Sequence, residues 1–368
     1  MNFDLSDEQK MLAEQARGLL AERTPYDHLR GLIDSGAEWD EALWQELAAM
    51  GFLGAAIAEA HGGLGMTALD LGVISEELGR VNASVPFFSS IVLAADAIAL
   101  AGSEEQKARW LPGLASGEVI GCFAASEGPG PYLGASVHVA GGRISGAKHP
   151  VADAGIAHVA VVQCGDALAI VELDQPGITR TKLDSFDQLR CHYRIDFADA
   201  AADMMPGRGK VETLLDRAAV QAAFEAVGGS EACLAMGLAY VKDRPMFGRP
   251  LASYQAIKHK LADVAVGIEL AKSNAYFGGW AADESADDLP MAAASARLSA
   301  ITAFEMAARE NLQVHGGIGY TFDANCHFYY RRERMLAVNI GNRAHWADRL
   351  IAHVPDSNGA GAAQGETV

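Results

Sequence analysis

The stretch QVHGGIGYT, residues Gln313–Thr321, decides how this chain folds, together with RPMFG at Arg244–Gly248 and with Gln255. In both segments a glycine-bearing turn interrupts long apolar stretches with helical spacing. The two segments carry one arginine and two glutamines, and a guanidinium group can hold a pyrophosphate through two parallel hydrogen bonds. Glycines let the backbone approach a planar ring closely. The combination predicts a site for a buried organic cofactor that carries phosphate.

The composition is that of an ordinary globular protein. The 368 residues are 50% hydrophobic and 21% charged, and a chain of this length can form two or three domains. Lys and Arg number 29 against 47 Asp and Glu, so the formal net charge is 29 − 47 = −18. This acidity argues against nucleic acid and against anionic membrane surfaces as partners. A few local arginines can still hold a phosphate in such a chain.

The sequence carries no sign of export or of a metal centre. Residues Met1–Asp4 end on an acid where a signal peptide would be basic and then apolar, and no apolar run has the length of a membrane span. Five cysteines are scattered along the chain without a CxxC pair. They are expected to be reduced thiols in a cytoplasmic protein, with no zinc site and no disulfide.

Hydrophobic spacing divides the chain into three zones and a tail. Residues 1–117 are expected to form an N-terminal helical domain, because Ser6 with Gln9 has the pattern of a capping box ahead of an apolar helical stripe. Thr67 begins a further helix of this zone. Residues 118–208 contain short apolar runs separated by Gly, Pro and Asp, and these runs predict a small β domain.

Residues 209–354 are Ala-rich and helical again. Four long segments, broken by Pro245, Pro250 and the glycines at 316, 317 and 319, predict helices at 211–243, 254–284, 290–314 and 330–353. Long helices with short connections indicate an antiparallel four-helix bundle. The tail of residues 355–368 is small and polar and is expected to be disordered.

The order of these zones and the two glycine-bearing motifs resemble the acyl-CoA dehydrogenases, flavin enzymes that desaturate acyl-CoA thioesters. The resemblance extends from Leu5 to about His353 and includes the shorter stretches Gly62–Gly65 and Gly146–Lys148. It implies an α+β, mainly α fold with an N-terminal helical domain, a central β domain and a C-terminal bundle. It also implies FAD as the cofactor, an acyl-CoA substrate, an electron-transferring flavoprotein or similar acceptor, and a role in fatty acid or steroid degradation.

In this family the FAD lies at a subunit interface, and one of its two protein surfaces comes from the neighbouring chain. Taken singly, an arginine near a helix end is usually a solvated charge and a Gly-Gly pair is usually a helix stop. Taken together in this chain, they favour the cofactor site. The resemblance implies that Arg244 pairs with the pyrophosphate of the neighbour's FAD, with Gln255 as a donor and Phe247 packed nearby, and that Gln313, Gly316 and Gly317 line the adenosine end.

The surface that would hold this chain's own flavin departs from the family pattern. The family has a Ser- or Thr-Glu-Pro segment followed by Gly-Ser-Asp, whereas this chain has Ser126–Pro129 and then Ala135 and Ser136 in place of the serine and the acid. The later Gly-x-Lys-x-Trp-x-Thr pattern has Pro150 for the tryptophan and Ala152 for the threonine. Hydroxyl groups and an aromatic platform are therefore missing from one wall.

The family's catalytic base is missing as well. The reaction removes a proton alpha to the thioester carbonyl while a hydride leaves the beta carbon for the flavin, so a carboxylate must reach the alpha proton. At the two positions where the family places this glutamate, the chain has Ile340 and Pro245. Of the acids nearby, Asp243 is expected to face solvent and Glu333 to be ion-paired at the surface. No catalytic residue is assigned.

Two histidines near the motifs have two interpretations. His315 lies inside the glycine turn and His259 follows Gln255 closely, so both are placed to contact the phosphate or the adenine. A packing or hydrogen-bonding role is the equal alternative.

These features lead to the hypothesis that the chain is the base-lacking subunit of an α2β2 acyl-CoA dehydrogenase, in which it completes the FAD site of a paralogous subunit. Dehydrogenases that act on sterol-derived CoA esters resemble this arrangement. One alternative is a self-sufficient homotetrameric dehydrogenase with an unrecognised base. Others are a non-catalytic acyl-CoA-binding or scaffold protein and a flavin-dependent oxidase or monooxygenase on the same fold.

Overall fold

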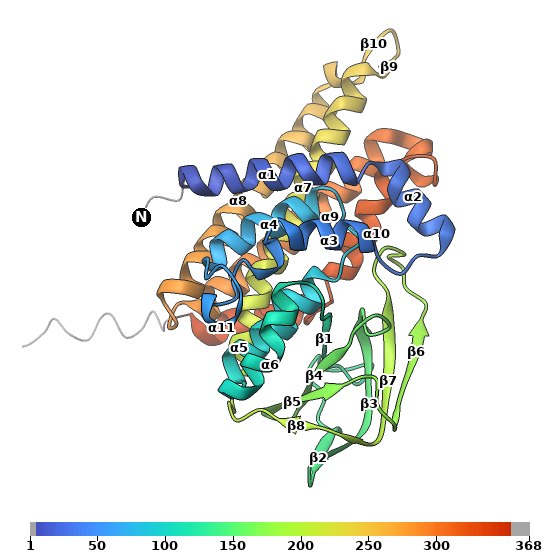
Figure 1. Cartoon of the computed structure of the whole chain (residues 1–368). Coiled ribbons are helices and arrows are strands. Elements are labelled where there is room, and N and C mark those ends of the chain that lie inside the picture. The colour runs from blue at the N-terminus through green and yellow to red at the C-terminus, as the bar shows by residue number, and fades with distance from the viewer. Residues whose placement is uncertain (1–4, 355–368) are drawn as a thin grey trace, which may run out of the picture.

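Six α-helices and a π-helix precede the first strand in the computed structural model, which describes residues 5–354 (Figure 1). Three of the helices begin with capping boxes. Ser6 Oγ accepts a hydrogen bond from the Gln9 amide at 3.1 Å, and the Gln9 side chain accepts one from the Ser6 amide at 3.0 Å. The helices of this zone are α1 (Asp7–Arg23), α2 (Tyr26–Ser35), α3 (Glu41–Ala49), α4 (Ala68–Arg80), α5 (Asp96–Ala101) and α6 (Glu104–Ala115).

The π-helix η3 (Phe88–Ala95) runs directly into α5. All of its residues are buried, and it packs on strand β1 (Gly121–Ala124) and helix α7 (Val211–Asp243). Turns of this wider type are rare and are frequently found at functional sites. This one supplies residues to the pocket described below.

Two four-stranded sheets form the central zone, which lies below the helices in Figure 1. The strand order is β1-β4-β5-β8 in one sheet and β2-β3-β7-β6 in the other. Strand β1 pairs with β4 in parallel, and the other neighbouring strands of the two sheets pair antiparallel. The remaining bounds are β2 (His138–Ala140), β3 (Arg143–Ala152), β4 (Val159–Cys164), β5 (Ala167–Glu172), β6 (Ile178–Leu183), β7 (His192–Ala201) and β8 (Asp203–Met204).

Burial and register explain the sequences of these strands. Strands β4 and β5 are buried along nearly their whole length, which is why they read as continuous apolar runs. Strand β3 pairs with β7 in a register that places Ala152 opposite His192. The pairing thus sets a residue of the expected flavin wall beside a histidine that the sequence motifs did not select.

The last zone contains five helices where the sequence predicted four. They are α7, α8 (Gln255–Glu284), α9 (Leu289–His315), α10 (Cys326–Leu336) and α11 (Arg343–His353). The prediction of one helix over 330–353 is wrong, because the chain breaks between α10 and α11. Gly341 has φ of 106°, which a helix cannot contain, and Asn342 then caps α11 by accepting a hydrogen bond from the His345 amide at 3.0 Å.

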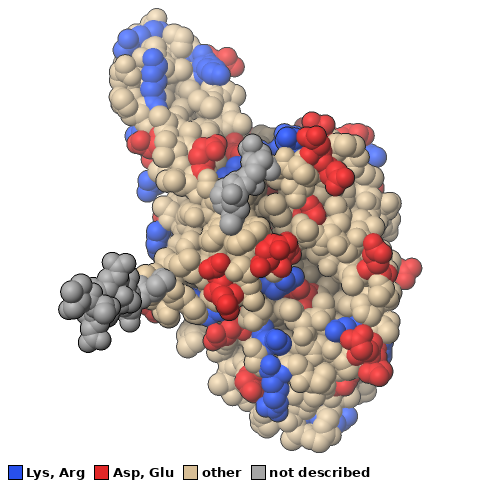
Figure 2. Space-filling model, turned by 90° about the vertical axis from the view of Figure 1, so that its left-hand side faces the viewer, with Lys and Arg blue, Asp and Glu red and all other residues tan. Residues whose placement is uncertain are grey.

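The paired ends of α7 and α8 project beyond the rest of the molecule (Figure 1). A short hairpin joins them, with strands β9 (Pro245–Met246) and β10 (Arg249–Pro250). Figure 2 shows Lys and Arg side chains gathered on this projecting end. Residues 242–260 hold five basic residues and one acid although the whole chain is acidic.

The described helices and the C-terminal tail were compared with two further predictions. Within residues 5–354, no helix combines the length and the apolar character that crossing a membrane requires. The tail of residues 355–368, which was expected to be disordered, lies outside the described residues.

Candidate functional site

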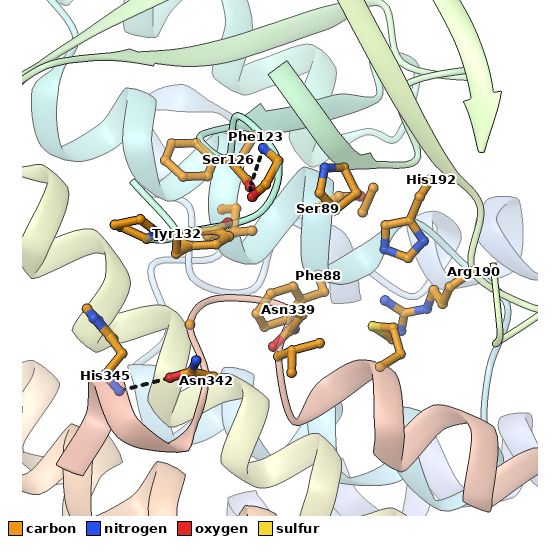
Figure 3. Close-up of a pocket in the computed structure, with 18 of the residues that line it drawn as sticks. Phe88, Ser89, Phe123, Ser126, Tyr132, Arg190, His192, Asn339, Asn342 and His345 are labelled. Atoms are coloured by element: carbon orange, nitrogen blue, oxygen red, sulfur yellow. Dashed lines mark hydrogen bonds between the residues drawn. The ribbon is translucent and has the colours of Figure 1, made fainter. Parts of the chain in front are cut away.

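A pocket of about 370 Å³ lies between the β region and the last two helices (Figure 3). Five segments contribute most of it: the π-helix η3, the loop after β1 at residues 126–132, strand β3, the start of strand β7, and the connection from α10 to α11. Aromatic and apolar side chains make up most of its walls, with Phe88, Phe123 and Tyr132 among them. A cavity of this size accommodates a small organic ligand.

The polar groups of the pocket are unusual for so acidic a chain. Among the described residues that line it, none is Asp or Glu, whereas Arg190, His192 and His345 are present. Figure 3 shows Arg190 and His192 close together at one end and Tyr132 and His345 at the other. The pocket therefore offers hydrogen-bond donors but no carboxylate that could accept a proton.

The positions that depart from the family pattern meet at this pocket. Pro150 and Ala152, which replace the family's tryptophan and threonine, line it from the β side beside Ser126. Ile340, which stands where the family places its base, is completely buried behind the lining. Its neighbours Asn339 and Gly341 reach the pocket instead. The missing base and the altered flavin wall thus belong to a single site.

The Glu127 carboxylate accepts hydrogen bonds from the donor groups on the outer part of this wall. Its carboxylate accepts hydrogen bonds from the Ser136 amide at 2.9 Å, the Ser136 hydroxyl at 2.6 Å and the Val137 amide at 3.1 Å. Lys148 Nζ lies 2.8 Å from the same carboxylate. Although burial opposes ionisation, the hydrogen bonds from Lys148 and Ser136 lower the pKa of Glu127 to about 2. The carboxylate therefore stays charged and engaged at neutral pH.

These residues do not fit a flavin held by this chain. Ala135 has no hydroxyl, and the hydroxyl of Ser136 is already donated to Glu127. Pro150 and Ala152 offer neither a stacking ring nor a donor to the pocket that they line. An isoalloxazine ring would meet few of the polar groups that orient it in the family.

The other predicted cofactor residues lie far from the pocket along the fold, at the projecting end of α7 and α8. Arg244, Phe247 and Gln255 are all exposed, and Phe247 is 91% exposed. The Arg244 guanidinium makes no hydrogen bond or ion pair with any residue between 5 and 354. An unpaired guanidinium on a basic projection suits a phosphate supplied from outside the chain.

The glycine turn lies beside this projecting end. Tyr240 and His315 stack with ring centroids 4.1 Å apart, and Val241 and Val314 share a small apolar cluster. Gln313 is exposed, as are Gly316 and Gly317. A Cβ built on Gly317 would meet no atom within 4 Å, so this chain's own packing does not require a glycine there. All six predicted residues are exposed, and the contact between Tyr240 and His315 places the glycine turn beside the end of α7.

The structure shows how far the acids and histidines near the motifs are buried and what they contact. Asp243 is exposed, as predicted. The prediction that Glu333 lies at the surface is wrong: its side chain is buried, although Arg334 Nε does lie 2.9 Å from one of its oxygens. Burial raises the pKa of Glu333 to about 7. His315 donates from Nδ1 to the Asn311 carbonyl at 2.8 Å and stacks on its neighbouring ring, while His259 is exposed.

Sequence reasoning missed Arg190 and His192. Both belong to the segment that enters β7, and no local motif marks them. Arg190 Nη2 donates to Glu225 Oε1 at 2.9 Å, and Arg332 joins Glu225 to Asp187 in the same buried network. Burial lowers the pKa of His192, so its ring is neutral at neutral pH. The β3–β7 register sets His192 opposite Ala152, and the pocket lining brings Arg190 to the same site.

Two family models match this chain. The acyl-CoA dehydrogenase N-terminal domain matches residues 6–118, and the acyl-CoA dehydrogenase C-terminal domain matches residues 207–352. Together they cover more than half of the sequence. The chain belongs to the acyl-CoA dehydrogenase family, whose members are oxidoreductases that act on CH–CH bonds. The predicted family and its mainly helical fold are confirmed.

The relatives and solved structures that resemble this chain include a steroid-type member of the family. The acyl-CoA dehydrogenase IpdE2 of Mycobacterium tuberculosis is 28% identical over 89% of this chain and 91% of its own. A chain of the Tcur3481–Tcur3483 steroid ACAD superimposes with a TM-score of 0.88 at 30% identity, covering 94% of this chain and 97% of that one. A chain of the ChsE4–ChsE5 complex from Mycobacterium tuberculosis gives a TM-score of 0.88 at 25% identity, with coverage of 96% and 100%. The predicted resemblance to steroid-type members is confirmed.

Proposed function

We propose that this chain is the base-lacking subunit of a heteromeric, FAD-dependent acyl-CoA dehydrogenase. In the assembly it would complete the FAD site of a paralogous subunit, which would carry the catalytic base. The observation that carries the proposal is the pocket without a carboxylate among its described lining residues, where Ile340 is buried at the base position. A site of this composition cannot remove a proton alpha to a thioester through an acidic side chain.

The exposed surface around Arg244 supports the second half of the proposal. When bound, FAD supplies the hydride acceptor of the reaction. This chain's part is to bind and orient it: Arg244 would neutralise the pyrophosphate, and the glycine turn at 316–317 would let the backbone approach the adenosine closely. Gln255 and Gln313 would add hydrogen bonds, and Phe247 would pack against the cofactor or the partner chain.

Similarity to solved structures supports the proposed substrate class. One solved structure to which the chain is similar is named a steroid ACAD, and another is a complex of two different chains. These names support a bulky steroid-type acyl-CoA as the substrate and a paralogous dehydrogenase subunit as the partner. An electron-transferring flavoprotein or a similar acceptor would reoxidise the flavin.

Co-expression with the paralogous chain from the native source tests the proposal. The chain purified alone should lack flavin absorbance, and the complex should show it and should desaturate an acyl-CoA in the presence of an electron acceptor. Stoichiometric FAD in the lone chain, or turnover by it, would refute the base-lacking role.

A matched pair of variants tests the contribution of Arg244. Arg244→Ala should lower the FAD content of the complex without lowering the thermal stability of the lone chain. Arg249→Ala is the control, because this arginine lies on the same hairpin but packs over the Tyr254 ring at 4.0 Å. Equal FAD loss from both variants would indicate a general charge effect and not a phosphate contact.

His192 favours one alternative, a self-sufficient dehydrogenase. It lines the pocket, and its lowered pKa leaves the imidazole free to accept a proton at neutral pH. This alternative predicts turnover by the isolated chain that is abolished in His192→Gln. A colourless and inactive lone chain excludes it.

A further inference from the structure

The pocket beside Arg190 has a polar end and apolar walls, and its composition points to a ligand other than a flavin. We infer that it binds a small organic carboxylate with a flat, apolar body, and that the carboxylate lies against Arg190 and Asn339. The inference rests on the proposed function, since flavin must be absent from this chain's own site.

Arg190 is the charged group of the site. It lines the pocket, yet only 6% of the residue is exposed. Its Nη2 atom donates to Glu225, and its Nε atom is buried without a hydrogen-bond partner in the described structure. No described residue accepts a hydrogen bond from Nη1, so the guanidinium that lines the pocket can donate from this atom to a ligand carboxylate. The guanidinium therefore has a reason to attract an anion into the pocket.

Asn339 extends this donor-rich end. The Oδ1 atom of Asn339 accepts a hydrogen bond from Arg297 Nη2 at 2.8 Å, which turns the amide so that its NH2 group remains as a donor. Arg297 is fully buried and makes no ion pair with a described residue, so its charge lies directly behind Asn339. His192 lies beside Arg190 (Figure 3). These groups favour an oxygen ligand with negative charge.

The acids nearest the site are held away from it. Glu225 and Asp187 are engaged by Arg332 behind the pocket. Asp153 accepts the hydroxyl hydrogen of Ser89 at 2.5 Å and is itself buried, outside the lining. A bound carboxylate would thus meet donors directly and would meet no acidic side chain among the described lining residues.

The opposite end of the pocket is suited to a flat hydrocarbon. Phe123 and Tyr132 line it together with prolines of the loop after β1, and Phe88 lies between the two ends, beside Asn339 (Figure 3). Rings of this kind pack well against a planar or fused-ring body. The cavity of about 370 Å³ holds a two-ring compound with a short acidic side chain. A long acyl chain or a complete dinucleotide would not match this volume and polarity.

Calorimetric titration of the purified full chain with two probes of one shape tests the inference. The probes are naphthalene-2-acetate and its neutral amide. A charge-assisted hydrogen bond from Arg190 should make the carboxylate bind about tenfold more tightly than the amide at neutral pH. Equal affinity of the two probes, or no binding of either, would overturn the inference.

Three variants identify the site. Arg190→Gln should remove the preference for the carboxylate, whereas Arg194→Gln should keep it, because Arg194 lies four residues further along, in β7, does not line the pocket and is paired with Asp196. Ala152→Phe should abolish binding of both probes, because the larger side chain fills the cavity. This variant tests the site independently if Arg190→Gln does not fold. Unchanged binding in Ala152→Phe would place the probes elsewhere and refute the assignment.

The outcome separates this inference from the proposed function. A lone chain that purifies with FAD refutes both. A colourless lone chain that does not prefer the carboxylate probe refutes the ligand assignment alone. The Arg244→Ala and Arg249→Ala variants then test the proposed function separately.

Discussion

The rings of Tyr240 and His315 stack with their centroids 4.1 Å apart, and this contact joins the end of α7 to the glycine turn. The Tyr240 hydroxyl also donates to the His315 carbonyl at 3.4 Å. Through this pair, two sequence motifs about seventy residues apart, near Arg244 and near Gly316, are held on one surface. Their relative position therefore depends on a packing contact that neither motif contains.

Loss of the Tyr240 ring should weaken FAD binding in the complex. Tyr240→Ala removes a stacked pair worth about 1 kcal/mol, so the FAD dissociation constant should rise by about three- to tenfold while the chain remains folded. Tyr240→Phe keeps the ring and should change FAD binding little. Flavin fluorescence of the diluted complex measures both, and an equal effect of the two variants would assign the role to the hydroxyl instead.

Gly317 offers a test of close backbone approach. An added Cβ meets no atom of this chain within 4 Å, and the residue does not have a left-handed backbone, so Gly317→Val should leave the thermal stability of the lone chain nearly unchanged. In the complex it should lower the FAD content severalfold, because a side chain would occupy the space of the cofactor. Gly18→Ala, which also has open space around it, is the control and should leave the FAD content unchanged.

Local signals in the sequence predicted much of this fold. The capping boxes at Ser6 and Thr67 set the starts of α1 and α4, because the groups that satisfy each other lie three residues apart. The breaks at Pro245 and Pro250 were likewise correctly placed, since proline cannot continue a helix. The break at 337–342 was not predicted, because a single glycine and an asparagine cap are weaker signals within a long helical pattern.

The parts of the site that depend on tertiary contacts could not be predicted. Arg190 and His192 face the pocket only because β3 and β7 pair in one register and because the chain turns between α10 and α11. Glu333 lies in a run of charged residues that reads as a surface, yet the packing of α10 buries it. Burial of an ion is decided by neighbours distant in sequence, and periodicity carries no information about them.

Removal of the Lys148 charge should be strongly destabilising. Its side chain is fully buried, and Nζ donates to the Ala125 carbonyl at 2.9 Å, to Glu127 at 2.8 Å and to Gln163 at 3.1 Å. Lys148→Met removes the charge that balances Glu127 and leaves the Ala125 carbonyl and the Gln163 side-chain oxygen without this donor, at a cost of about 3 to 5 kcal/mol of unfolding free energy. Urea unfolding of the lone chain measures it.

A double variant gives the control for this ion pair. Adding Glu127→Gln to Lys148→Met removes the unpaired charge, so part of the lost stability should return. If the two changes were simply additive, the pair would contribute nothing as a pair, and the assignment of Lys148 as the partner that keeps Glu127 ionised would be wrong.

Glu333 should make the stability of the chain depend on pH. Burial raises its folded-state pKa to about 7, above the 4.5 of an unperturbed glutamate, so the folded chain binds the proton more tightly than the unfolded chain. The contribution of this residue is therefore most favourable below pH 4.5 and is lost as the pH rises toward 7. Glu333→Gln mimics the protonated form and should relieve the loss.

The difference in unfolding free energy between Glu333→Gln and the unsubstituted chain should be about 2 kcal/mol larger at pH 8 than at pH 5.5. Urea titrations at the two pH values measure it. Glu305→Gln is the matched control, because Glu305 also pairs with Arg334 but is 38% exposed and so lacks the burial that acts on Glu333. If the difference in unfolding free energy between Glu333→Gln and the unsubstituted chain is the same at pH 5.5 and pH 8, burial does not raise the pKa of Glu333, and the prediction is wrong.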